Sequence, residues 1–175
     1  DPTAAGIATQ ELSVGEIGFD TFTYTLIEDT ISTNGYGFTS QTSATVTITL
    51  TGVNDAPTVS DTSIAAFEDG VTVDGSFVGD DVDHDDDGST INYSIVADLG
   101  VGEGSVVNNT DGTFTFDPGS DFQDLADGET RDVFFTYKAT DSQAIDSAVD
   151  ATVTITVTGV NDSPIAGDDL RTVAQ

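Results

Sequence analysis

The chain of 175 residues contains no cysteine, methionine or tryptophan, one histidine and only three lysine or arginine residues. The lack of cysteine excludes disulfides, thiolate metal sites and thiol catalysis. Because His84 is the only histidine, zinc sites built from histidines and serine–histidine triads are also disfavoured. No apolar run approaches the roughly 18 residues that a membrane helix needs, so we expect no direct membrane insertion.

Acidic residues, by contrast, are abundant. Asp and Glu number 32 against three Lys and Arg, for a formal net charge of -29. Such a surface repels phosphate backbones, so we expect no nucleic-acid partner. Only six of the acids are Glu, which leaves 32 - 6 = 26 Asp. Asp favours turns, caps and ligand loops over helix interiors, which indicates that the charge lies in turns.

Two stretches of the chain repeat one another. Residues 44–57 read ATVTITLTGVNDAP and residues 151–164 read ATVTITVTGVNDSP, with Asn54 and Asn161 107 positions apart. Further upstream, LSVGE precedes FTY in the first copy and LADGE precedes FTY in the second. A repeated block of this length indicates tandem domains.

The repeat divides the chain into three parts. Residues 1–53 are predicted to be the C-terminal part of a preceding repeat, residues 54–161 one complete repeat, and residues 162–175 the linker and first strand of a following repeat. A unit of about 100 residues is a common domain size.

Within the complete repeat, apolar residues alternate with polar ones, as in strands with one buried face. The inward rows are Val133, Phe135, Tyr137 and Ala139, and Val153, Ile155 and Val157. Threonine and valine suit such a pleated, half-buried surface. About seven short strands separated by turns predict an all-β fold, an antiparallel β-sandwich.

The densest acidic cluster runs from Asp80 to Asp87. Within it, Asp83, Asp85 and Asp87 alternate before Gly88, a spacing that can turn three carboxylates onto one hard cation. An EF-hand would place a glutamate at position 12, where this chain has Ser94, so that motif is not present. The ordinary alternative is a solvated acidic loop. However, neighbouring carboxylates repel one another by up to about 1 kcal/mol per pair in water, and Ca²⁺, which prefers oxygen ligands, would relieve this repulsion.

A second element is the Asn-Asp pair at each repeat boundary, Asn54-Asp55 and Asn161-Asp162. Each pair offers an amide oxygen and a carboxylate, and a proline two residues later stiffens the chain. A single copy would be interpreted as an ordinary Asx turn. Its recurrence at both boundaries favours ligands in a linker.

The TVTITVTGVNDSP ending, the DGTFTFDP hairpin and the LADGE–FTYKATD run resemble VCBS-type repeats. These are cadherin-like modules of large bacterial surface or secreted adhesins of the RTX type. The resemblance covers the whole chain and implies β-sandwiches joined end to end, with Ca²⁺ at the junctions.

The resemblance also implies the ligands. For the first junction these are Glu16, Asn54, Asp55, Asp81, Asp83 and Asp141, with Asp85 and Asp87 added from the acidic cluster. For the second junction they are Glu68, Glu129, Asn161 and Asp162. The sequence departs from cadherin linkers at Gly52 and Gly159, where cadherins carry an additional aspartate, so one or two ions per junction are expected rather than three.

The function implied is an extracellular repeat that Ca²⁺ makes rigid, which serves as a spacer at the bacterial cell surface or in cell adhesion and biofilm. Its partners would be neighbouring repeats, and cell-surface polysaccharide or another adhesin copy. The alternative is a Ca²⁺-dependent polysaccharide-binding module, although the exposed tryptophan platform typical of such modules is absent. An enzyme is not expected, because solvated acidic loops provide no pocket that would raise the pKa of one carboxylate.

Overall fold

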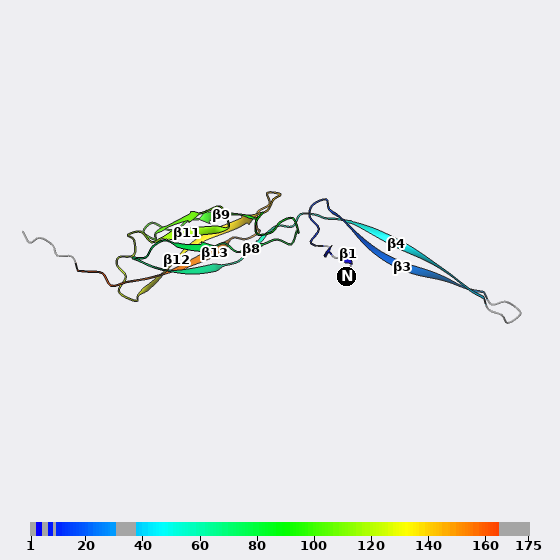
Figure 1. Ribbon diagram of the computed structural model, residues 1–175, viewed down its shortest axis with the longest axis horizontal. Coiled ribbons are helices and arrows are strands. Elements are labelled where there is room, and N and C mark those ends of the chain that lie inside the picture. The colour runs from blue at the N-terminus through cyan, green and yellow to red at the C-terminus, as the bar shows by residue number, and fades with distance from the viewer. Residues whose placement is uncertain (1–2, 5–6, 9, 31–37, 165–175) are drawn as a thin grey trace, which may run out of the picture.

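The structure, a computed structural model, describes residues 3–4, 7–8, 10–30 and 38–164 (Figure 1). The strand expected after residue 164 lies outside the described residues. Within the described part, all regular elements are β-strands, and the complete sandwich and a long hairpin follow one another along the longest axis.

The sandwich consists of two sheets with seven strands. A four-stranded sheet has the order β6 (Thr62–Phe67), β13 (Ala151–Thr158), β12 (Thr130–Thr140), β9 (Asn92–Ala97). A three-stranded sheet has the order β10 (Ser105–Asn108), β11 (Thr113–Asp117), β7 (Val73–Ser76). The predicted all-β sandwich is confirmed, with one exception to its antiparallel pattern: β13 runs parallel to β6.

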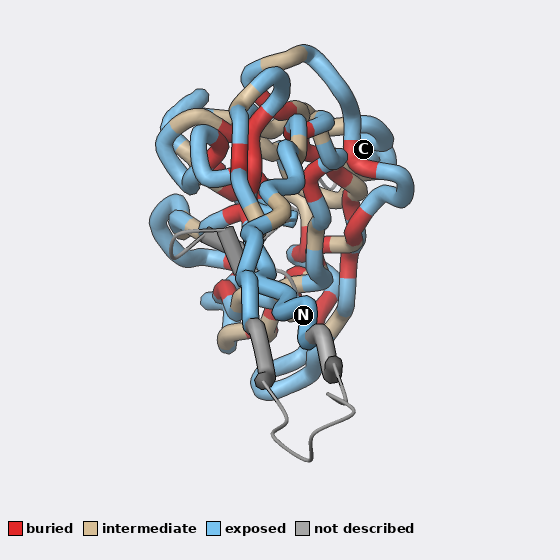
Figure 2. Tube along the Cα trace, turned by 90° about the vertical axis from the view of Figure 1, so that its right-hand side faces the viewer, coloured by how far each residue is buried: buried red, intermediate tan, exposed pale blue. Residues whose placement is uncertain are grey.

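The predicted inward rows form the core. On β13 burial alternates at every residue, because successive side chains of a strand point to opposite faces. Phe135 and Tyr137 on β12 are 1% and 0% exposed. Phe135 meets Phe114 of the other sheet edge to face, with ring centroids 5.1 Å apart. Contacts of this kind join the two sheets, and Figure 2 shows the buried segments gathered inside the sandwich.

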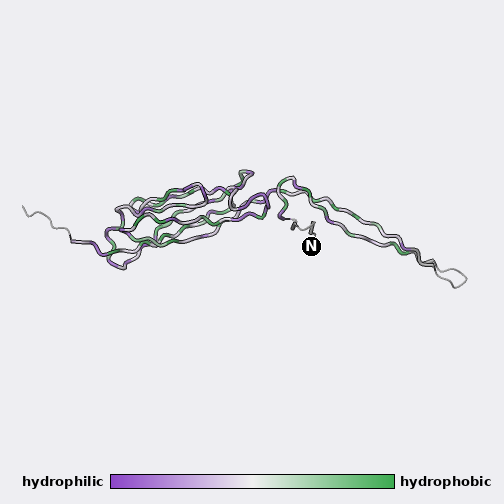
Figure 3. The backbone as a smooth tube through the Cα atoms, viewed as in Figure 1, coloured by the Kyte–Doolittle hydropathy of each residue, from purple (hydrophilic) through white to green (hydrophobic). Residues whose placement is uncertain are grey.

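The remaining strands lie toward the other end of the chain. Short strands β5 (Thr58–Val59) and β8 (Gly79–Asp80) pair beside the first linker. Beyond it, β3 (Ile17–Thr30) and β4 (Phe38–Thr51) form a long two-stranded hairpin, preceded by the short pair β1 (Thr3–Ala4) and β2 (Ile7–Ala8). Hydrophilic residues gather at the end of the sandwich that faces this hairpin (Figure 3).

Candidate metal centre

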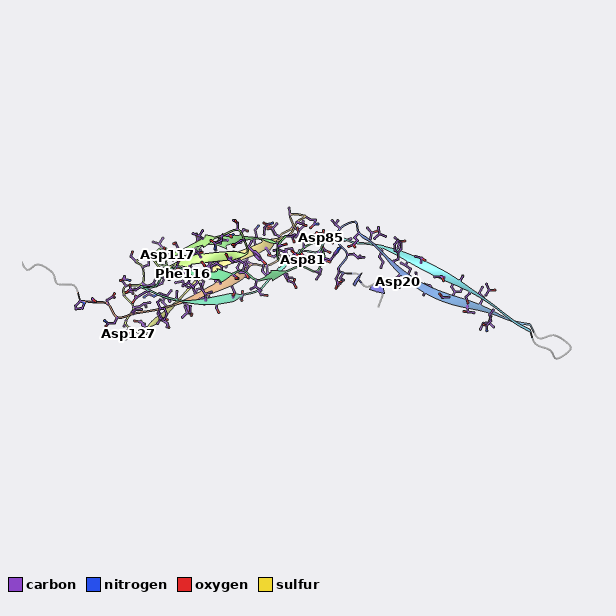
Figure 4. All side chains as sticks on the ribbon, viewed as in Figure 1. Asp20, Asp81, Asp85, Phe116, Asp117 and Asp127 are labelled. Carbon is purple, nitrogen blue, oxygen red and sulfur yellow. The ribbon has the colours of Figure 1, made fainter. Side chains whose placement is uncertain are left out.

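Three chain segments converge at the hairpin end of the sandwich. The linker supplies Asn54 and Asp55, the loop after β8 supplies Asp81 and Asp83, and the residue after β12 is Asp141. Figure 4 labels Asp81 where the sandwich meets the hairpin. Asp83 is 2% exposed and Asp141 is 3% exposed, unusually low values for carboxylates.

Hydrogen bonds hold these carboxylates in place. The Asp55 amide donates to Asp83 Oδ2 at 2.8 Å, and Asn54 Nδ2 donates to Asp141 Oδ2, also at 2.8 Å. The Ile145 amide donates to Asp141 Oδ1 at 2.7 Å. The linker is therefore fixed to two buried acids of the repeat that follows it.

Three oxygens at this place are buried without a hydrogen-bond partner: Asn54 Oδ1, Asp81 Oδ2 and Asp83 Oδ1. Leaving a buried polar group unpaired is costly, and more so for a charged one. Amide and carboxylate oxygens are the ligands that Ca²⁺ takes. The donor set left open here therefore fits a hard divalent cation.

The charges of this cluster act on one another. The pKa of Asp81 is raised above its ordinary value, first by burial and then by the negative charges of Asp83, Asp86 and Asp141; an amide hydrogen bond from Asp83 opposes the rise. Within the described residues, no three acidic or histidine side chains already stand close enough together to hold a metal ion.

The alternating triplet of the acidic loop is not uniformly turned inward. Asp83 is buried, whereas Asp85 and Asp87 are exposed. The Ser13 hydroxyl is the main cause that lowers the pKa of Asp85, and the Ser89 hydroxyl does the same for Asp87. Asp85 is held at the surface by Ser13 and Gln143, and Asp87 by Ser89; that the three carboxylates share one cation stays a prediction.

Asp86 is the residue of this loop that sequence reasoning missed. It is 3% exposed and accepts hydrogen bonds from the amide and hydroxyl of Ser142, at 2.9 and 3.0 Å. It thereby fastens the acidic loop to the loop that follows β12. Its partner lies 56 positions away, so nothing in the local pattern distinguishes Asp86 from its neighbours.

The hairpin side of the junction meets the same loop. Glu16 Oε2 lies 3.1 Å from His84 Nδ1, and Ser13 Oγ lies 3.0 Å from that same nitrogen. The His84 amide donates to Glu11 O at 3.2 Å, and the Asp85 amide donates to Ser13 Oγ at 3.2 Å. The structure thus brings Glu16 to the acidic loop through His84.

The opposite end of the sandwich holds the second predicted group. Glu68 is 1% exposed; its Oε1 accepts from the Val160 amide at 2.6 Å, while its Oε2 is buried without a partner. Glu129 is exposed and accepts from the Ala126 amide at 3.0 Å. The linker residues there, Asn161 and Asp162, are exposed.

The two linkers begin in the same way. Asn54 Nδ2 donates to the carbonyl of Asp55 at 2.6 Å, and Asn161 Nδ2 donates to that of Asp162 at 3.1 Å. In the Asx turn considered as the ordinary alternative, the side-chain oxygen would accept from a backbone amide, whereas here the side-chain nitrogen donates. Asn54 Oδ1 has no hydrogen-bond partner and is therefore left open as a ligand.

A backbone clasp precedes each linker. In the first copy Gly15 donates to the Gly52 carbonyl at 3.0 Å and Gly52 to the Glu16 carbonyl at 2.8 Å. Ser13 and Glu16 close the clasp through Glu16 N to Ser13 O and Ser13 N to Glu16 Oε2. In the second copy, the same four bonds recur among these residues: Ala126, Gly128, Glu129 and Gly159.

The clasp explains one departure from cadherin linkers. A Cβ on Gly52 would lie 2.1 Å from the Ser13 carbonyl oxygen, and one on Gly159 would lie 2.3 Å from that of Ala126. Since both neighbours are backbone atoms, no side chain can stand at either position without moving the chain. An aspartate ligand is therefore excluded here, and a backbone contact takes its place.

A profile of the bacterial cadherin-like domain family matches residues 54–159. Since this is more than half of the chain, the chain belongs to the bacterial cadherin-like domain family. Cadherin-like domains are an adhesion-type fold that is not enzymatic, and they are extracellular in homologues. Among the described residues, no helix is long and apolar enough to cross a membrane.

Several solved structures are similar to the chain. Drosophila N-cadherin EC1-4 is 17% identical, with 89% of this chain and 36% of that chain covered and a TM-score of 0.46. Human mucin-like protocadherin EC1-2 is 18% identical, with 82% of this chain and 68% of that chain covered and a TM-score of 0.46. A nucleoside hydrolase-related hypothetical protein from Saccharophagus degradans is 20% identical, with 60% and 26% covered and a TM-score of 0.36.

The chain thus spans little more than a third of the length of the N-cadherin chain. A search of curated proteins found no match.

Proposed function

We propose that this chain is a Ca²⁺-binding spacer repeat of a bacterial surface or secreted adhesin of the VCBS type. The observation that carries the proposal is the set of three buried, unpartnered oxygens on Asn54, Asp81 and Asp83. They come from the linker and from the repeat that follows it. A cation held by them would tie the two together.

The residues of the chain prepare this site before any ion arrives. Asp83 and Asp141 orient the linker through the Asp55 amide and the Asn54 side chain. Asp86 holds the acidic loop against Ser142. When bound, Ca²⁺ would supply the positive charge that the clustered carboxylates lack, so that their mutual repulsion no longer loosens the junction.

The second junction is proposed to follow the same logic. Glu68 presents a buried, unpartnered oxygen at the other end of the sandwich, close to where Asn161 and Asp162 leave it. Glu129 would join them from the clasp. Cations at both ends would convert a flexible string of repeats into a stiff rod, which suits a spacer that projects a binding domain away from the cell.

The energetic effect is measurable. Extracellular calcium modules bind with dissociation constants of about 10⁻⁴–10⁻³ M. Calcium at ten to one hundred times such a value stabilises the folded state by about 1.4–2.7 kcal/mol per site. For a domain of this size each kcal/mol raises the melting temperature by about 4–8 °C.

The test is a calcium titration followed by differential scanning calorimetry. The wild-type chain is compared with Asp83→Asn, which keeps the shape of the side chain but removes its charge. Asp98→Asn, an exposed aspartate outside the cluster, serves as the matched control. We expect calcium to raise the melting temperature of the wild type and the control by at least about 5 °C, and of Asp83→Asn much less. Equal melting of the wild type in calcium and in chelator would refute the proposal.

A further inference from the structure

The hairpin β3–β4 has the same cross-strand register as β12–β13, the central strand pair of the sandwich. Phe22 lies opposite Val46 in the hairpin, and Phe135 lies opposite Val153 in the sandwich. The cross-strand register is therefore the same in both copies. The hairpin is the structural counterpart of β12–β13.

Burial, however, differs sharply between the copies. Phe22 is 54% exposed whereas Phe135 is 1% exposed, and Tyr24 is 44% exposed whereas Tyr137 is fully buried. One face of the hairpin carries an apolar row at alternate positions: Phe22, Tyr24, Leu26, Val46, Ile48 and Leu50. A row that is core in one copy lies open in the other.

The opposite face of the hairpin carries hydroxyls along its middle. Thr23 and Thr45 lie 3.2 Å apart, and Thr25 and Ser43 lie 3.0 Å apart, oxygen to oxygen. Toward its ends the same face exposes three apolar side chains: Ile17, Phe19 and Ile27. The continuous apolar row, which suits a second sheet, therefore lies on the face of Phe22 and Tyr24.

The sandwich shows what covers such a row. Phe135 meets Phe114 of β11 at 5.1 Å, and Tyr137 meets Phe77, which follows β7, at 4.8 Å. The covering layer is the three-stranded sheet β10–β11–β7, whose residues precede β12 in the chain. The sheet in this chain is already occupied by β12–β13, and the hairpin lies beyond the end of the sandwich (Figure 1).

A second copy of the hairpin is a poorer occupant. The two faces would present the same aromatic row to each other, with no complementary sheet.

We propose that the apolar face of β3–β4 docks a three-stranded sheet of its own repeat, equivalent to residues 73–117 and earlier in the same polypeptide. The partner is defined by its chemistry: alternating phenylalanines at the positions of Phe114 and Phe116, on a sheet with the order of β10–β11–β7. The hairpin then completes a second sandwich. This inference does not rest on calcium binding.

The experiment supplies the missing layer. A copy of residues 54–116 is joined ahead of Asp1 of the full chain, because Asp1-Pro2 repeats Asp117-Pro118. Hydrogen–deuterium exchange of the β3 and β4 amides is measured in chelator, with and without the extension. We expect exchange to slow at least tenfold with the extension, and an apolar dye that binds the chain to be released.

Two variants of the extended chain locate the contact. Phe22→Asp places a charge on the apolar face and is expected to abolish the protection. Thr23→Asp places the same charge on the hydroxyl face and should retain it. Sedimentation of the original chain measures its oligomeric state and so tests whether a second copy covers the apolar face instead.

Two results would overturn the proposal. One is fast exchange of β3–β4 in the extended chain. The other is a dimer of the original chain that already protects the apolar face, with no further slowing on extension. Because every measurement is made without calcium, failure here is distinct from failure of the metal site.

Discussion

A matched pair of substitutions, Phe22→Ala and Phe135→Ala, tests whether the stability of the sandwich depends on its own core and not on the hairpin. The two residues occupy the same register position in two copies of one strand pair. Phe135 is 1% exposed, and its ring meets those of Phe77 and Phe114 at centroid distances of 6.4 and 5.1 Å. Phe22 is 54% exposed.

The magnitudes follow from burial. Truncation of a buried phenylalanine to alanine costs about 3–5 kcal/mol, because apolar contact is lost and a cavity remains. The two edge-to-face contacts place Phe135→Ala in the upper part of this range, about 4 kcal/mol. An exposed substitution usually changes stability by less than about 0.5 kcal/mol. A small domain has only about 5–15 kcal/mol in total, so the contrast is large.

Urea unfolding, followed by tyrosine fluorescence and far-ultraviolet circular dichroism, measures the stability of both variants. We expect the midpoint of the sandwich transition to fall strongly for Phe135→Ala and to stay unchanged for Phe22→Ala. If Phe22→Ala were to lower that midpoint as much as Phe135→Ala, the hairpin would have to be part of the sandwich core, and the reasoning from exposure would be refuted.

Three further predictions concern single contacts. The Tyr137 hydroxyl donates to Ser60 O at 2.6 Å, and burial is the main cause that raises its pKa. The stability that this group contributes is therefore complete below about pH 10 and should fall as the pH rises further. Tyr137→Phe should be destabilised by about 1–3 kcal/mol, and its urea titrations at alkaline pH should show less of that fall. Gly159→Ala should destabilise the sandwich by about 1–3 kcal/mol in thermal melts, whereas Gly88→Ala, whose Cβ would meet open space, should not; equal effects would refute the clasp. His84→Ala removes the side-chain contact with Glu16, and chelator-treated samples should show a larger radius in small-angle scattering; an unchanged profile would mean that this contact does not hold the junction.

The polar site could be predicted only in part. The linker pairs and the acidic loop stand out locally, so recurrence and spacing indicate Asn54 and Asp83, whereas Asp81 follows only from the resemblance to cadherin-like repeats. Which carboxylates are buried was not identifiable, because Asp86 gains its place from Ser142, 56 positions away. Asp85, although next in the alternation, stays at the surface.

The sequence by itself determined the strands, the faces they bury and the repeat of 107 residues, because alternation and self-similarity are properties of neighbouring positions. The tertiary structure alone decided which copies of the pattern become core. Phe22 and Phe135 both begin a Phe-Thr-Tyr run, yet only Phe135 is covered, since burial requires a second sheet brought from a distant segment. The same holds for the oxygens at the junction, whose lack of partners follows from how three separate segments meet.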